Sequence, residues 1–143
     1  DDAGVAHRTS ALLADAVRLP FRDAYADVIV SRGSFPFWSD VRAGIAEVYR
    51  VLKPGGVAFL GRGFSENLPV ETARRIRERQ KVTGGPPPYD PIASAERLAR
   101  IARELGVADY EVHRPAPPGG EDVNYGVWLE LRKPPEEPGT REP

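Results

Sequence analysis

Short apolar runs alternate along this sequence with amphipathic stretches of helical period. Apolar runs at residues 11–14, 26–31, 57–60 and 123–131 predict strands, and residues 109–114 alternate like a partly exposed strand. This alternation is typical of a sheet whose faces are covered by helices. We therefore predict an α/β fold with a mostly parallel sheet and an antiparallel last strand.

The first predicted helix spans residues 41–52, where apolar side chains recur at steps of three and four. Either Ser39 or Asp40 can cap its start. Pro54 and the two glycines after it end the helix, because proline cannot continue a helix and glycine accepts a positive φ.

Two further helices are predicted in the second half of the chain. The first begins near Pro69 and has a narrow apolar stripe among many arginines, which indicates a helix on the surface. The prolines and glycines of residues 84–88 then interrupt any regular element. Asp90 and Pro91 supply an N-cap and a first-turn proline for the last helix, which ends at Gly106.

Composition narrows the function classes. The 143 residues carry 20 Lys and Arg against 21 Asp and Glu, and a net charge of -1 does not favour a nucleic-acid interface. The absence of cysteine excludes disulfides and thiolate metal sites. No apolar run is long enough to span a membrane, so we expect a soluble, cytoplasmic protein.

The ends of the chain give two expectations about its organisation. Residues 1–132 have the composition of one compact domain, whereas residues 133–143 are rich in proline and glutamate and are expected to form a disordered tail. The sequence contains no methionine, including at its first position, and this favours a fragment of a longer protein.

Two segments carry a family resemblance. Residues 15–31 read DAVRLPFRDAYADVIVS and residues 47–56 read EVYRVLKPGG. Together they resemble the middle of a class I S-adenosylmethionine-dependent methyltransferase of the small-molecule, ubiquinone-biosynthesis branch. The resemblance implies a Rossmann-like fold and methyl transfer to a small-molecule acceptor, with no nucleic-acid or membrane partner.

The resemblance also implies a set of cofactor-binding residues. In this family the aspartate at the position of Asp15 accepts a hydrogen bond from the adenine amino group, as a carboxylate can, and the backbone N–H of Ala16 faces an adenine ring nitrogen. Leu19 shapes the adenine pocket, and residues after the next strand contact the methionine part of the cofactor. The alternative is that both segments are ordinary turns. The predicted cofactor site consists of Asp15, Ala16, Leu19, Ser31, Arg32 and Gly33.

Three aromatic residues follow the predicted cofactor site directly. Phe35, Phe37 and Trp38 are expected to line the acceptor pocket, with Trp38 favoured, because aromatic walls exclude water and attract a cationic sulfonium. Packing under the next helix is the alternative, and for Phe35 it is equally favoured. Residues 69–90 are a candidate substrate-covering insertion. Positioning alone can support displacement at a sulfonium, so neither a catalytic base nor a metal site is predicted.

One feature of the family is missing from the sequence. The family's glycine-rich loop has no counterpart, since the nearest string, Gly61-Arg62-Gly63, follows a later strand. We therefore expect the C-terminal part of a methyltransferase domain, with an exposed edge at residues 28–30. Such an edge favours self-association or a companion N-terminal half. The alternative function is a non-catalytic binding or assembly module derived from the same fold.

Overall fold

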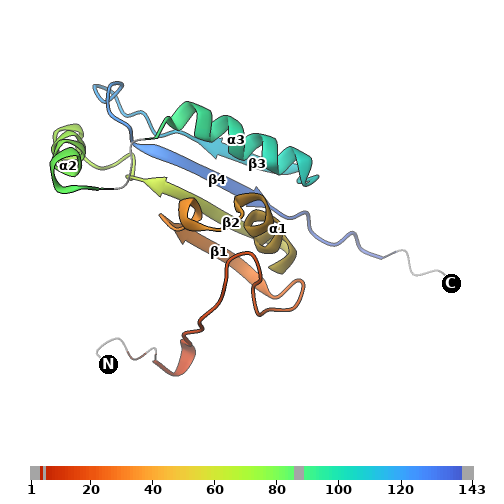
Figure 1. Ribbon diagram of the computed structural model, residues 1–143. Helices are drawn as coiled ribbons and strands as arrows, with labels where there is room; N and C mark the ends of the chain where they lie inside the picture. Colours follow the sequence, from red (N-terminus) through yellow and green to blue (C-terminus); the bar gives the residue numbers. More distant parts are fainter. Residues whose placement is uncertain (1–3, 5, 86–88, 140–143) are drawn as a thin grey trace.

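A single four-stranded sheet organises the chain (Figure 1). The computed structural model describes residues 4, 6–85 and 89–139. The strands stand in the order β1-β2-β4-β3, with β1 and β2 parallel and β4 antiparallel to both of its neighbours. Three strands therefore point one way and the last strand points the other, as predicted for this α/β fold. Their bounds are Ala26–Arg32 for β1, Leu52–Gly63 for β2, Asp109–His113 for β3 and Gly126–Arg132 for β4.

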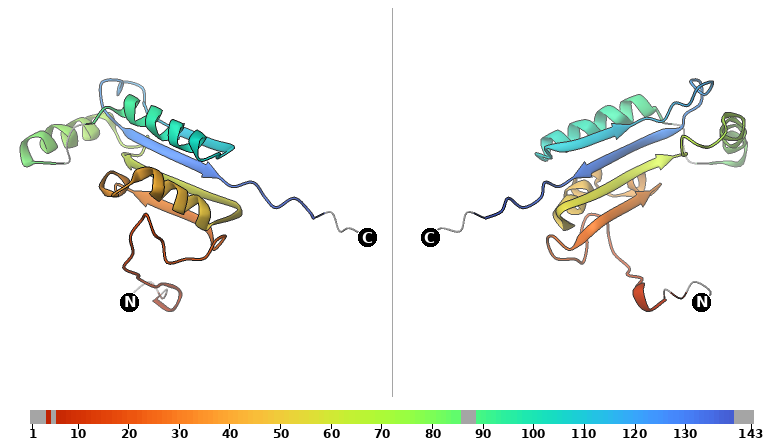
Figure 2. Two further views of the ribbon diagram at one scale, coloured as in Figure 1. Left: turned by 45° about the vertical axis from the view of Figure 1, so that its right-hand side comes forward. Right: turned by 180° about the vertical axis from the view of Figure 1, so that it is seen from behind.

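Two of the three α-helices cover one face of the sheet, as the two views of Figure 2 show. These are α1 (Val41–Val51) and α3 (Pro91–Glu104), whereas α2 (Val70–Thr83) lies beyond the carboxyl end of β2. Short 3-10 turns occur at Ala6–Arg8 (η1) and Phe35–Phe37 (η2). Within the described part of the chain, no helix is both long and apolar enough to cross a membrane.

The predicted helix starts are confirmed. The Asp40 carboxylate accepts a hydrogen bond from the Ala43 N–H at 2.9 Å, and Asp90 accepts one from the Ile92 N–H at 2.8 Å. Each cap satisfies a backbone donor that the first turn of a helix leaves unpaired. The surface position of α2 is also confirmed, because Ala73 is its one buried residue among those described.

Apolar side chains of α1 and α3 form the core against the sheet. Ile45 from α1 is 1% exposed, and Leu129 at the centre of β4 is fully buried. Both belong to a single cluster that also includes Leu98 and Ile101 of α3. The helical spacing in the sequence therefore identifies the buried face of each helix.

The predicted strand at residues 11–14 is wrong. This segment forms neither helix nor strand, and the Leu13 side chain is fully exposed. The closest feature is an isolated bridge between Asp15 and Arg18. A strand needs a partner for its backbone groups, and no described strand pairs with this segment.

The predicted end of the first helix is confirmed, because α1 stops at Val51 and Gly55 has a positive φ of +78°. The residues after it differ from the expected turn. Residues 53–56 lie inside β2, which starts at Leu52 directly after α1.

The segment expected to be a disordered tail, residues 133–143, is fixed to the fold at its first residue. The Lys133 ammonium donates hydrogen bonds to the backbone carbonyls of Tyr49 and Leu52. Residues 140–143 of that tail lie outside the described part of the chain, as do residues 86–88 of the candidate insertion.

One edge and one face of the sheet are open. β1 pairs with β2 alone among the described strands, and the side chains of Val28 and Val30 are 61% and 67% exposed. They share the face opposite α1 and α3 with Phe59, which stacks on Trp128 at 5.0 Å between ring centroids. The exposed edge expected from the sequence is thus present, together with an uncovered apolar face.

Candidate functional site

The turn after β1 is fixed to the carboxyl end of β2. The Gly33 N–H donates to the Gly61 carbonyl at 2.7 Å, and the Arg32 guanidinium donates to the Gly63 carbonyl at 3.2 Å. Gly33 has a φ of +77°, which glycine adopts without strain. The hydroxyls of Ser31 and Ser34 are hydrogen-bonded to each other. These contacts place residues 31–33 at the edge of the sheet where open α/β folds hold their ligands.

The predicted adenine segment forms a tight, exposed turn. The Asp15 carboxylate accepts a hydrogen bond from the Val17 N–H at 3.1 Å, and the Asp15 carbonyl accepts one from the Arg18 N–H at 3.0 Å. Ala16 and Leu19 are partly buried beside it. The carboxylate therefore has the turn-capping role of the alternative interpretation, and its exposure leaves it accessible to a ligand as well.

An ion pair on α1 joins the two family motifs. Glu47 accepts a hydrogen bond from the Leu19 N–H at 2.9 Å and pairs with Arg50 at 2.8 Å. The Arg50 guanidinium also donates to the carbonyls of Leu19 and Phe21 and to the Asp23 carboxylate. Glu47 and Arg50 of the second motif thus hold residues 19–21 of the first motif in place.

The ion pair of Glu47 and Arg50, which we call the clamp, shifts the pKa of both side chains. Hydrogen bonding to Arg50 lowers the pKa of Glu47, partly offset by desolvation, and the same contact together with Asp23 raises the pKa of Arg50. A carboxylate whose pKa falls on folding stabilises the fold above the pKa of the unfolded chain. This stabilisation is lost as the pH falls through the lower, folded pKa.

We expect Glu47→Gln to lower the free energy of unfolding by about 1 to 2 kcal/mol at pH 7, because the Leu19 N–H and Arg50 lose an ionised acceptor. The difference from the parent should shrink as the pH falls below 4.5, the ordinary pKa of this group. Urea unfolding at several pH values measures both effects. Glu96→Gln, on the exposed side of α3, is the control, and a difference that stays constant with pH would contradict the clamp.

The three predicted acceptor-site aromatics occupy different environments. Phe35 is 8% exposed and belongs to the core, which matches the packing alternative. Trp38 packs against Gly44 of α1, where its ring leaves no room for a Cβ atom, and its indole N–H donates to the Ser34 hydroxyl. Phe37 is 79% exposed and lines a cavity beside Gly33. Of the three, Phe37 is the side chain that borders open space.

Two adjoining cavities of about 610 Å³ each lie between this sheet edge and α2. Arg62, Arg77, Gln80 and Tyr89 line both. The Arg62 guanidinium lies over the Tyr89 ring at 3.7 Å from its centroid, and that of Arg77 lies over the Phe64 ring at 4.3 Å. The combined walls are therefore basic and aromatic.

The sequence places Arg77 and Tyr89 within the candidate substrate-covering insertion at residues 69–90 but does not single them out, and it gives no signal for Arg62. The arginines near Arg77 are equally typical of a solvated surface helix, and Tyr89 follows the residues that interrupt the helices. One signal was available, since Arg77 lies four residues after Ala73 and therefore on the buried side of α2. The position of Tyr89 depends on tertiary packing, which local patterns do not encode.

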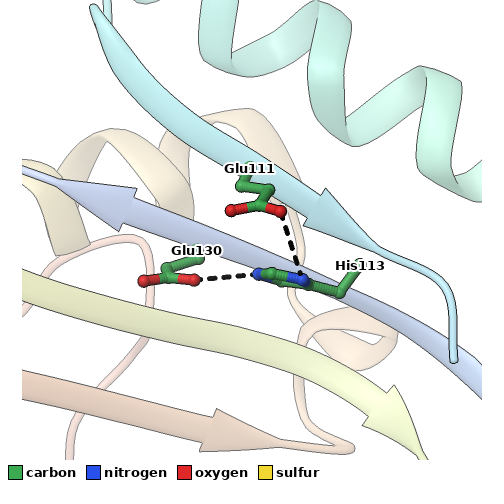
Figure 3. Close-up of side chains that lie close together, drawn as sticks. All are labelled: Glu111, His113 and Glu130. Carbon is green, nitrogen blue, oxygen red and sulfur yellow. Dashed lines mark hydrogen bonds and ion pairs between the residues drawn. The ribbon is translucent and has the colours of Figure 1, made fainter.

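A separate polar group of Glu111, His113 and Glu130 lies on β3 and β4 (Figure 3). None of the three lines either cavity. His113 Nε2 lies 2.8 Å from Glu130 and Nδ1 lies 3.7 Å from Glu111. The candidate ligand atoms of the three side chains lie within 4.8 Å of one another. Arg132 also contacts both carboxylates, at 3.5 Å and 2.6 Å. With a guanidinium on the acids and each ring nitrogen facing a different one, the group forms a cross-strand ion-pair network.

Comparisons with known proteins point to one family. A methyltransferase-domain family matches residues 2–60. Over 46 residues the chain is 56% identical to 2-methyl-6-phytyl-1,4-hydroquinone methyltransferase of Arabidopsis thaliana, covering 32% of this chain and 14% of that protein. Over 126 residues it is 29% identical to protein YafE of Escherichia coli, covering 85% of this chain and 55% of that protein.

A solved structure extends the match to nearly the whole chain. A protein from Methanococcus maripaludis, assigned as an S-adenosyl-L-methionine-dependent methyltransferase, superimposes with a TM-score of 0.68 at 30% identity. The match covers 96% of this chain and 60% of that one. The recognition as a class I methyltransferase is confirmed. The matched hydroquinone methyltransferase agrees with the resemblance to the ubiquinone-biosynthesis branch. The chain spans 14%, 55% and 60% of the lengths of these three proteins.

Proposed function

We propose that this chain takes part in S-adenosylmethionine-dependent methyl transfer to a small-molecule acceptor. The observation that carries the proposal is the ion-pair clamp of Glu47 and Arg50, which fixes the adenine-type motif at Leu19 against α1. Methyltransferase relatives in sequence and in structure support it. A cytoplasmic location remains a prediction from the sequence.

The residues present fit the cofactor at several points. Asp15 offers an exposed carboxylate, an acceptor suited to an adenine amino group, and Ala16 and Leu19 border it. Gly33 has open space where a Cβ atom would stand, so its backbone is accessible to a ligand. When bound, the cofactor supplies an electrophilic methyl group on sulfonium.

In this proposal the chain acts by positioning the methyl acceptor. Phe37 and the cavity walls hold the acceptor near residues 31–33, and aromatic side chains exclude water from that side. Displacement at a methyl group needs the acceptor atom in line with the leaving sulfur, and fixed geometry lowers that barrier. No side chain is assigned as a base in this step.

The open edge of β1 needs a partner in this proposal. We expect a companion segment or a second copy of the chain to pair with residues 28–30, because exposed apolar edges recruit strands. The same open edge favours the second candidate, a binding or assembly module without catalysis. Cofactor binding separates the two candidates, because the second one does not require it.

We expect S-adenosylmethionine to bind saturably, near one molecule per chain, in calorimetric titration of the purified chain. Asp15→Ala should weaken this binding by about 10-fold, the effect of removing one charge-assisted hydrogen bond. Glu136→Gln, an exposed acid far along the chain, is the control and should bind like the parent. Light scattering in the same buffer records the oligomeric state. No binding, at any oligomeric state, would favour the assembly module.

A further inference from the structure

The cavity walls between α2 and the end of β2 contain polar groups without partners. Among the described residues, two buried side-chain polar atoms lack any hydrogen-bond partner: Arg77 Nη2 and the Tyr89 hydroxyl oxygen. Both residues line the same two cavities. Unpartnered buried groups are rare in proteins because each one costs a lost interaction with water. The two groups are neighbours, and Tyr89 raises the pKa of Arg77, against the effect of burial. Both can still donate to a ligand in these cavities.

The other bonds of Arg77 fix its orientation. Its Nε donates to the Asn124 carbonyl at 2.9 Å and its Nη1 donates to Gln80 at 3.0 Å, while its face rests on Phe64. The remaining nitrogen is therefore held without help from a ligand. Burial lowers the pKa of Arg77, since it removes water from the charged guanidinium. An anion would restore part of that lost solvation.

Positive charge exceeds negative charge at this place. One of the two cavities is lined by two acids, Asp122 and Glu78, of which Asp122 neutralises Arg74. In the described part of the chain, no carboxylate lies within ion-pair distance of Arg62, Arg77 or Arg32. Arg32 bonds a backbone carbonyl and Arg62 covers the Tyr89 ring. Three cations without a counter-ion thus surround one space, next to the turn at residues 31–33.

We propose that these cavities bind the methyl acceptor through an anionic oxygen group, a carboxylate or a phosphate ester, held by Arg77 and Tyr89. Arg77 Nη2 can donate to one oxygen of such a group, and the Tyr89 hydroxyl can donate to another. Phe64 and Tyr89 supply apolar walls for the rest of the molecule. This assignment rests on the proposed methyl transfer and names its substrate class.

Three matched probes test the assignment on the full chain. Benzoate, phenyl phosphate and the uncharged benzamide share a ring and differ in the group presented to Arg77. We expect at least one anion to bind about 10-fold tighter than benzamide, as one charge-assisted pair provides. The stronger of the two anions identifies the group as carboxylate or phosphate. Equal binding of all three probes, or binding of none, would overturn the proposal.

Variants locate the binding. Arg77→Gln should remove the preference for the anion, whereas Arg97→Gln, an exposed arginine on α3, should leave it unchanged. Because Arg77 packs on Phe64, circular dichroism and the melting temperature of each variant are recorded. Arg62→Gln, at a partly buried position that lines both cavities, should lower the preference for the anion as well. An anion preference that survives both substitutions would contradict the site.

The same samples separate this inference from the proposed function. S-adenosylmethionine titrated into Arg77→Gln should bind within about 2-fold of the parent, since the proposed cofactor contacts at Asp15, Ala16 and Leu19 do not involve Arg77. Cofactor binding without anion preference would overturn the acceptor assignment and keep methyl transfer. Anion preference without cofactor binding would keep the anion site and overturn methyl transfer. A large loss of cofactor affinity in Arg77→Gln would mean that the cavity holds the cofactor's own carboxylate, against the proposal.

Discussion

Gly63→Ala is expected to lower the free energy of unfolding by at least about 3 kcal/mol. Gly63 has a φ of +132°, and a Cβ atom there would lie 2.1 Å from the Tyr125 carbonyl oxygen. That neighbour is backbone of the adjoining chain segment, so it cannot move aside as a side chain can. The clash would separate β2 from β4 at the end that leads into the candidate site.

A second glycine gives the matched control. Gly55 also has a positive φ, of +78°, but nothing lies within 4 Å of its Cβ position. Gly55→Ala should therefore cost about 1 kcal/mol, the strain of the backbone alone. Urea unfolding of both variants measures the two losses in the free energy of unfolding. If Gly63→Ala does not fold, the soluble yields of the two variants are compared instead. Equal effects at the two positions would contradict the close approach of β2 and β4.

Ile45→Ala is expected to lower the free energy of unfolding by about 3 kcal/mol, within the range for a buried isoleucine that leaves a cavity. Ile45 is 1% exposed, on the side of α1 that packs against the sheet. Ile92→Ala is the control, because it makes the same change of side chain at a position of α3 that is 51% exposed. It should lower the free energy of unfolding by less than about 1 kcal/mol. Calorimetric melting of both variants measures the difference. Similar losses would mean that α1 does not cover the sheet.

The local parts of the fold could be predicted from the sequence. The N-caps Asp40 and Asp90 and the strand that starts at Ala26 are each encoded by neighbouring residues, and the structure contains all three. The strand is not buried on both faces as its apolar character predicts, because Val28 and Val30 are exposed. Residues 11–14 have the same apolar character, yet they form no strand, because pairing depends on a partner elsewhere in the chain. Apolar composition alone does not supply that partner.

The candidate site also contains residues that local sequence predicts and residues that it does not. The turn at residues 31–33 follows from a strand end, which the pattern reveals, and the family motifs add Asp15 and Leu19. The orientation of Arg77 into a cavity depends on the packing of α2 against the segment before β4. Tyr89 reaches the same cavity from a segment without regular structure. No local pattern distinguishes these two residues from surface arginines and loop tyrosines.

The proposed cofactor site runs along Asp15 to Leu19 and includes residues 31–33. Titration of the isotope-labelled chain with S-adenosylmethionine, followed by the backbone amide signals in nuclear magnetic resonance spectra, shows which residues the cofactor reaches. We expect shifts at Ala16, Leu19 and Gly33, while the amides of β3 (Asp109–His113) stay in place. Shifts confined to β3 and β4, or none at saturating cofactor, would contradict it.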